Sequence, residues 1–274
     1  MKIALQLGLI PGQTTADKAK WAADNGVQGI ELGVFGVSNE QLRCQADDIN
    51  GLVPISSVCA NAQPDGTKSF DFLHPEKKKR RESIDGSKAV LKFCGEVGAV
   101  GQIAPPIFGG PLVPDLSPAF TIAQLEDALM LEACRELGPF AAEHNTLFML
   151  EPLNRYEQHY LKTQADGMRI MDEAKVSGLG LLSDFFHMNI EETDLPAAFA
   201  VAKGYTTAIH LADNTRMEPG TGNIDFVASF KVLKANGYDG FMAYECGISG
   251  NDAEEKAANL AKSLDYIRSC IDKA

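Results

Sequence analysis

The feature that most constrains the fold is an alternation of short apolar runs with longer stretches of helical periodicity. It extends along the 274 residues and is typical of consecutive βα units around a parallel sheet. Most of the apolar runs are continuous, as expected for strands that are buried on both faces. We expect eight strands, at residues 2–8, 29–34, 53–61, 100–105, 146–151, 180–185, 206–212 and 240–245.

Capping residues mark where the intervening helices begin. Ser38 with Gln41 and Thr121 with Gln124 form capping-box patterns, and Asp225 stands where an N-cap is needed. Length and alternation together predict one α/β domain over residues 1–274, a single (β/α)8 TIM barrel, because such barrels commonly span roughly 250 residues.

Glycines and a proline indicate where helices end. Asn25-Gly26 and Asn236-Gly237 offer left-handed stops, and we expect Gly138-Pro139 to kink or break a helix. The apolar residues between 257 and 267 follow a helical period, which predicts a last helix packed on the barrel wall.

Composition excludes several classes of protein. With 45% hydrophobic and 23% charged residues, the chain has the mix of a globular protein. Its net charge of −12 disfavours nucleic acid and anionic membranes as partners. The six cysteines form no C-x-x-C pair, which indicates reduced thiols and a cytoplasmic protein. The apolar start is interrupted by Gln6 and is interpreted as a strand, and no apolar run reaches the ~20 residues of a membrane span.

Four metal-competent side chains stand at the ends of the last four expected strands. They are Glu151, Asp184, His210 and Glu245, and successive members lie 33, 26 and 35 residues apart. Each separation corresponds to about one βα unit, so all four should emerge at the end of the barrel that holds active sites. Acidic residues that merely cap helices or face solvent would explain any one of them, but explain four in series poorly.

This set predicts a site for one divalent cation. Three carboxylates and one imidazole suit Mn²⁺ first, with Mg²⁺, Co²⁺ or Zn²⁺ as alternatives. Glu157, His187 and Arg216 stand one loop away and are candidate substrate-binding residues. His187 can also be read as a buried histidine bonded to a carbonyl, and Arg216 with Glu157 as an ion pair that braces loops.

Three further motifs have ordinary structural interpretations. The Gly220-Thr221-Gly222 sequence lacks the third glycine of a dinucleotide fingerprint and is expected to be a tight turn. The basic run at 77–81 is expected to be a solvated helix face. Cys59 and Cys246 stand at strand ends and can line the pocket, but the sequence shows no base that would make either a nucleophile.

Several of these segments resemble the ketose 3-epimerase family, which includes D-tagatose and D-psicose 3-epimerases and belongs to the xylose-isomerase-like barrels. The resemblance is carried by EPLNRYE at 151–157, DFFHMN at 184–189, HLADNTR at 210–216 and PGTGNID at 219–225. No pocket motif of the family is matched in the first half of the chain.

The resemblance implies a specific chemistry. An ion of the Mn²⁺ type would be bound by Glu151, Asp184, His210 and Glu245 together with O2 and O3 of the sugar. Glu157, His187 and Arg216 would contact the substrate near C1 and O2. Glu151 and Glu245 would exchange a proton with opposite faces of C3 through a cis-enediolate, and dimers or tetramers are common among such proteins.

We therefore expect a metal-dependent sugar isomerase or epimerase that acts at C3 of a ketose-like substrate. Hydroxypyruvate isomerase is an alternative, because the loop from Glu218 to Gly222 resembles that branch too, and a keto-inositol or keto-sugar dehydratase is another. An apurinic endonuclease would need more histidines than the five in this chain. A non-catalytic sugar-binding barrel is disfavoured by the presence of both Glu151 and Glu245.

Overall fold

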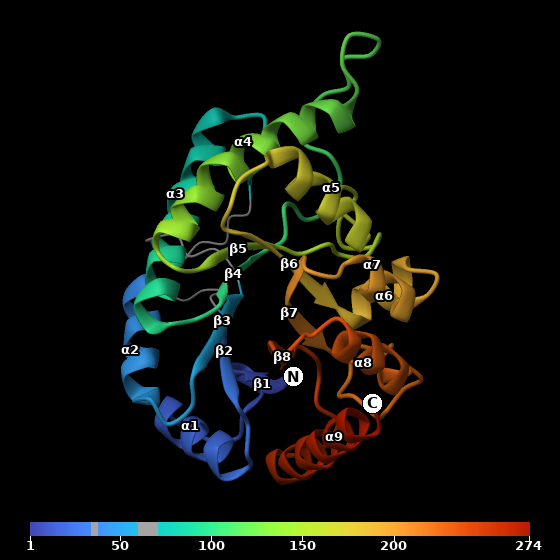
Figure 1. Cartoon of the computed structure of the whole chain (residues 1–274). Coiled ribbons are helices and arrows are strands. Elements are labelled where there is room, and N and C mark those ends of the chain that lie inside the picture. Colours follow the sequence, from blue (N-terminus) through green and yellow to red (C-terminus); the bar gives the residue numbers. More distant parts are fainter. Residues whose placement is uncertain (34–37, 60–70) are drawn as a thin grey trace.

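The strands of the molecule form a closed ring. The computed structural model describes residues 1–33, 38–59 and 71–274. Its eight strands pair in parallel in sequence order, and β8 pairs with β1 to close the barrel. Helices surround the ring, as Figure 1 shows. The predicted (β/α)8 fold is confirmed.

All eight strands lie where the apolar runs predict them, and most are one or two residues shorter at an end. Val34, Ala60 and Asn61, which were included in the expected strands, lie outside the described residues. The strands are β1 (Lys2–Gln6), β2 (Gly29–Gly33), β3 (Ile55–Cys59), β4 (Gly101–Ala104), β5 (Leu147–Leu150), β6 (Leu179–Asp184), β7 (Thr206–Leu211) and β8 (Phe241–Tyr244).

Helices connect the strands and begin largely at the predicted caps. The side chains of Ser38, Thr121 and Asp225 each accept a hydrogen bond from a first-turn amide. The helices are α1 (Thr15–Asp24), α2 (Asn39–Ile49), α3 (Lys77–Val97), α4 (Ile122–Glu143), α5 (Gln164–Ala174), α6 (Phe185–Glu191), α7 (Leu195–Val201), α8 (Phe226–Ala235) and α9 (Ala253–Lys273), with a 3₁₀ turn, η1, at Leu7–Leu9.

One predicted helix break is absent. Helix α4 continues through Gly138 and Pro139, so a break at this dipeptide was wrong. Gly138 lies against the carbonyl of Ser177, where an added Cβ would be only 2.6 Å from the oxygen. The buried side chains of Leu137 and Ala141 flank the dipeptide. Burial of this face outweighs the single backbone hydrogen bond that a proline removes.

The inner face of the barrel carries an apolar layer directly beneath the strand ends. Met149, Leu182 and Ala208 pack in one buried cluster with Cys59 and Ile103. Because side chains two residues apart in a strand point to the same face, residues 151, 184 and 210 also face the barrel interior. The side chains at the strand ends therefore lie directly above a buried apolar layer.

The last helix packs on the outside of the barrel as predicted, burying Leu260, Leu264 and Ile267. The basic run at 77–81 begins α3, and Lys77, Lys78 and Lys79 are exposed. Among the described residues, no helix is long and apolar enough to cross a membrane.

Candidate metal centre

Four side chains converge at the carboxyl ends of β5 to β8. Glu151 and Glu245 directly follow β5 and β8, Asp184 is the last residue of β6, and His210 lies in β7. One ligand atom from each of them lies within 4.8 Å of all the others. The sequence placed these residues at one end of the barrel, and the structure brings them together as a set that we call the strand-end cluster.

The imidazole of His210 is at the centre of this cluster. Its Nδ1 lies 2.8 Å from Oε2 of Glu245, 3.3 Å from Oε1 of Glu151 and 3.5 Å from Oδ2 of Asp184. The His210 side chain is fully buried. One ring nitrogen therefore faces three carboxylates from three different strand ends.

Two buried polar atoms of the cluster indicate that it fits a cation. Oε1 of Glu151 and Nδ1 of His210 make no hydrogen bond to any residue in the described part of the chain. Buried polar atoms rarely lack partners, and these two face the same space as the remaining carboxylate oxygens. Three carboxylates and a neutral imidazole form a donor set for a divalent cation such as Mn²⁺ or Mg²⁺.

Arg216 supplies positive charge beside two of these carboxylates. Its Nη1 lies 2.7 Å from Oδ2 of Asp184, and its Nη2 donates to Oε2 of Glu245. The ion-pair partners of Arg216 are thus Asp184 and Glu245. Among the described residues, the alternative ion pair between Arg216 and Glu157 does not form.

The backbone of Arg216 holds an uncommon conformation that directs its side chain into the site. Its φ angle is +60°, in the left-handed region that a long side chain rarely adopts. Its amide donates to the carbonyl of Asp213 at 2.9 Å, and its own carbonyl accepts from the amide of Gly247 at 2.7 Å. The loops after β7 and β8 thus fix this residue together.

His187 and Glu157 lie beside the cluster. Nε2 of His187 is 4.0 Å from Oδ2 of Asp184, and its Nδ1 is 3.8 Å from Oε1 of Glu157. The same Nδ1 faces the backbone amide and side-chain amide of Asn154, at 3.2 and 2.8 Å. The bonding partner of His187 is therefore Asn154 rather than the carbonyl considered above, and an Nδ1 that accepts leaves its Nε2–H directed toward the cluster.

The carboxylates of the cluster differ in acidity. Burial raises the pKa of Glu151 above its ordinary value. Burial also acts to raise the pKa of Glu245, but His210 and Arg216 outweigh it and lower that pKa to about 2. In Asp184, Arg216 and His187 overcome the effect of burial and hold the pKa far below its usual range. The two glutamates therefore differ in proton affinity in the metal-free protein.

The Gly220-Thr221-Gly222 segment is a turn with a structural role. The buried carboxylate of Asp213 accepts hydrogen bonds from the amides of Asn214, Gly220 and Ile224 at 2.9, 2.9 and 3.2 Å. A Cβ on Gly222 would lie 2.3 Å from Oδ1 of Asp213. Glycine is needed because the turn wraps closely around this carboxylate, as the interpretation of a tight turn required.

The two strand-end cysteines are weak nucleophiles. Burial, together with the nearby carboxylates of Glu245 and Glu31, raises the pKa of the Cys59 thiol well above its ordinary value. Burial raises the pKa of Cys246 to about 12. Both side chains are therefore thiols rather than thiolates at neutral pH.

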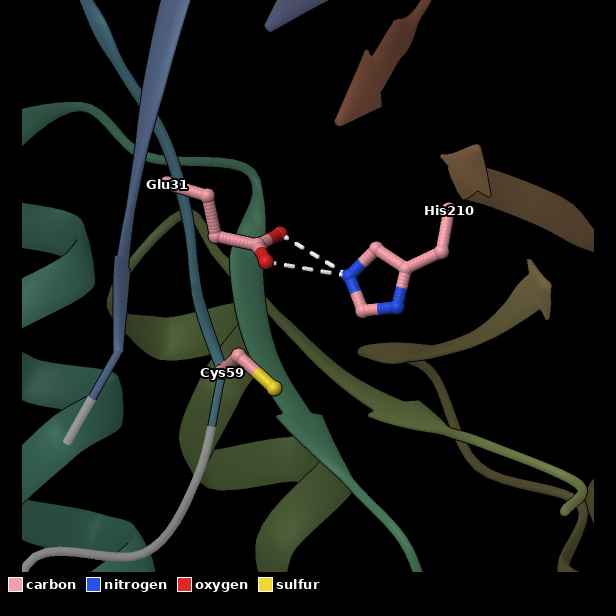
Figure 2. A group of neighbouring side chains, drawn as sticks. All are labelled: Glu31, Cys59 and His210. Atoms are coloured by element: carbon pink, nitrogen blue, oxygen red, sulfur yellow. Dashed lines mark hydrogen bonds and ion pairs between the residues drawn. The ribbon is translucent and has the colours of Figure 1, made fainter. Parts of the chain in front are cut away.

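Three polar residues near the site were missed by the sequence reasoning. Glu31 in β2 faces His210 across the barrel interior (Figure 2). Ser57 Oγ donates to Glu31 at 2.6 Å, and Gln6 Nε2 donates to Glu31 at 3.0 Å. Glu31 is fully buried, and a carboxylate within an apolar strand run is a signal of function that could have identified it.

The chain is similar to known proteins along most of its length. The model of the family described as xylose isomerase-like TIM barrel matches residues 19–270. The 3-dehydro-D-guloside 4-epimerase of Escherichia coli strain K12 is 31% identical over 274 residues, which cover 98% of this chain and 100% of that protein. The D-psicose 3-epimerase of Enterocloster bolteae is 32% identical over 142 residues, which cover 51% of this chain and 47% of that protein.

Solved structures show the same similarity in three dimensions. The crystal structure of 3-keto-D-glucoside 4-epimerase from E. coli, in its apo form, superimposes with a TM-score of 0.83 at 26% identity. The superposition covers 98% of this chain and 100% of that one.

Proposed function

We propose, from the premise that this chain belongs to the xylose isomerase-like TIM barrel family, that it inverts the carbon next to the ketone of a keto sugar with the help of one divalent cation. Relatives matched along the chain are epimerases, so the chain is a sugar epimerase, and its resemblance to the ketose 3-epimerases is confirmed. The observation that carries the detailed proposal is the convergence of three carboxylates and one imidazole within 4.8 Å.

The strand-end cluster would hold the cation through Glu151, Asp184, His210 and Glu245. When bound there, the cation supplies Lewis acidity, which stabilises negative charge on the oxygens of the reacting carbons. We favour Mn²⁺ because three hard oxygen donors accompany a single imidazole. Arg216 would keep Asp184 and Glu245 in place through its two hydrogen bonds, and Asp213 holds the backbone of Arg216.

Glu151 and Glu245 are the two bases of the proposed reaction. Each provides a carboxylate oxygen near Nδ1 of His210, and they come from the ends of β5 and β8. A C–H bond beside a ketone is weakly acidic, so its proton must pass directly to a positioned carboxylate. One glutamate takes the proton from one face of this carbon, and the other returns a proton to the opposite face, which inverts it.

Glu157, His187 and Arg216 would bind the polar groups of the sugar around the reacting carbons. Arg216 and the Nε2–H of His187 are hydrogen-bond donors that face the cluster. Glu157 is exposed to solvent, and its carboxylate can accept a hydrogen bond. Donors placed where negative charge develops favour the enediolate over the ketone. These residues would therefore affect the rate as well as binding.

The substrate that we place first is a 3-keto glycoside inverted at C4. The relative that carries this type of activity in its name aligns with 98% of the chain, including the half in which no ketose-epimerase pocket motif was found. A 2-ketose inverted at C3 is the second candidate, because the segments between Glu151 and Glu245 resemble ketose 3-epimerases. The chemistry is the same in both, since each reacting carbon is adjacent to the ketone.

Solvent isotope exchange tests the proposal directly. Protein loaded with Mn²⁺ is incubated in D₂O with 3-keto glycosides and with 2-ketoses, and deuterium is located by NMR. We expect deuterium and inversion at the carbon beside the ketone, in 3-keto glycosides before ketoses. Absence of exchange with every substrate would refute the enediolate chemistry. Loss of water would identify a dehydratase, and an aldose product an isomerase.

A further inference from the structure

We propose that Glu31 is a positioning residue that sets the orientation and the proton of His210 for cation binding, and that Gln6 extends this control to Glu245. The inference rests on the proposed cation site but not on the proposed reaction. It concerns residues of β1, β2 and β3, the strands that carry none of the four ligands.

The first step is the contact between Glu31 and His210. Nε2 of His210 lies 3.0 Å from Oε1 and 3.2 Å from Oε2 of Glu31 (Figure 2). Both side chains are excluded from solvent. An ionised carboxylate can only accept hydrogen bonds, so Nε2 carries a hydrogen, and Nδ1 is the nitrogen that can present a lone pair to a cation. This is the nitrogen that faces Glu151, Asp184 and Glu245, as a ligand atom must.

The second step is the way in which Glu31 itself is held. Ser57 Oγ donates to its Oε2 at 2.6 Å, and Gln6 Nε2 donates to its Oε1 at 3.0 Å. The carboxylate therefore has donors from β3, β1 and β7 and cannot rotate without losing them. A side chain that is fixed in this way can fix the imidazole ring in turn.

The third step links this network to one of the proposed bases. Gln6 Nε2 also donates to Oε1 of Glu245 at 3.0 Å. Oε2 of Glu245 remains for His210 and Arg216. One amide group thus joins Glu31 to Glu245 and determines which oxygen of this base faces the cluster.

A different interpretation is that Glu31, Cys59 and His210 hold a second ion, because their ligand atoms lie within 4.8 Å of one another. The contacts favour positioning. Ser57 and Gln6 already occupy both oxygens of Glu31. The Cys59 thiol donates to Glu245 at 3.8 Å. His210 would also have to lose its last N–H proton to bind two ions at once.

The test compares two buried glutamates that each bond Nε2 of a histidine. Glu31→Gln removes the charge beside His210, whereas Glu126→Gln removes the charge beside His159, where the distance is 2.7 Å and the strand-end cluster is not contacted. The dissociation constant for Mn²⁺ is measured on the full chain from the EPR signal of free Mn²⁺. We expect Glu31→Gln to weaken binding by about 10-fold or more, and Glu126→Gln to leave it unchanged.

The unfolding temperature of the metal-free proteins separates positioning from damage to the fold. If Glu31→Gln does not fold, Ser57→Ala replaces it, because it removes only one bond to Glu31 and should weaken Mn²⁺ binding by a few-fold. Unchanged Mn²⁺ affinity in a folded Glu31 variant would overturn the proposal. The proposal would also be overturned if the wild-type chain bound two Cd²⁺ ions and the Cys59→Ser variant bound only one, because Cys59 would then be a ligand of a second ion. The Mn²⁺-binding measurement uses no substrate, so its outcome does not depend on whether the epimerase assay succeeds.

Discussion

Arg216 and Asp184 form a partly buried ion pair in which Nη1 of the arginine lies 2.7 Å from Oδ2 of the aspartate. The Asp184 side chain is fully buried and that of Arg216 is 27% exposed. The arginine neutralises one carboxylate among several that would otherwise repel one another. It also occupies a strained backbone conformation, so its place in the fold is maintained by the contacts that it makes.

Removal of the arginine should therefore destabilise the metal-free protein. In Arg216→Gln, Asp184 and Glu245 lose their charged donor, and leaving the fully buried carboxylate of Asp184 without it should cost about 3 kcal/mol. A bound cation replaces part of that positive charge, so the loss should be smaller with saturating Mn²⁺. Urea unfolding of wild type and variant, each with and without Mn²⁺, measures both differences. Equal losses under the two conditions would contradict this role.

The two proposed bases should be separable by isotope exchange. At saturating Mn²⁺, Glu245→Gln and Glu151→Gln should each lower the rate of inversion by about 10²–10⁴-fold. Each variant should still exchange deuterium into the one epimer whose proton faces the glutamate that remains, without inverting it. NMR of each epimer in D₂O reports this asymmetry. If one variant inverts at the wild-type rate, its glutamate is not a base in the reaction.

The barrel and the strand-end cluster were predictable because both follow from regular spacing. Continuous apolar runs separated by helical stretches leave few arrangements other than a parallel barrel. Polar residues at the ends of such runs must then meet at one rim. Glu151, Asp184 and His210 were located in this way without knowledge of any contact.

The surrounding network was harder to predict. Glu31 lies within β2, and strands that are buried on both faces give no alternating pattern to show which side chains point inward. The contact of Gln6 with Glu245 joins residues 239 positions apart, and it arises only when β8 closes on β1. The conformation of Arg216 likewise depends on the loop after β8, through Gly247.

Acid stability should depend on a pair of helices far from the site. Glu136 in α4 accepts from Arg81 at 2.8 Å and from Lys88 at 2.6 Å. These cations, against a smaller opposing effect of burial, lower the pKa of Glu136 to about 2. The pKa is lower in the folded than in the unfolded chain, so the stabilisation is complete above about 4.5 and is lost as the pH falls through about 2.

Glu136→Gln should remove that dependence. Because solvent screens this partly exposed ion pair, we expect the variant to lose only about 1 kcal/mol of unfolding free energy at pH 7. The difference from wild type should shrink as the pH approaches 2. Urea unfolding at several pH values between 2 and 7 checks this. A difference that grows toward acid pH would show that the sign assigned to this carboxylate is wrong.

The turn around Asp213 links the stability of the β7–α8 loop to activity. In Gly222→Ala the new Cβ would lie 2.0 Å from Oδ1 of Asn214 and 2.3 Å from Oδ1 of Asp213. Neither oxygen is free to withdraw, because backbone amides bond to both. The turn must therefore open, which should cost about 1–3 kcal/mol. Since Asp213 also anchors Arg216, the turnover rate should fall about 10-fold or more.

Gly110→Ala is the matched control, because an added Cβ there meets no atom within 4 Å. It should unfold like the wild type, so that the loss in Gly222→Ala is assigned to the turn rather than to a methyl group. The affinity for Mn²⁺ distinguishes a displaced Arg216 from displaced cation ligands, because Asp213 holds Arg216 and not a ligand. We expect Gly222→Ala to keep most of its Mn²⁺ affinity while its turnover rate falls. A variant that loses both in proportion would mean that the turn supports the ligands themselves.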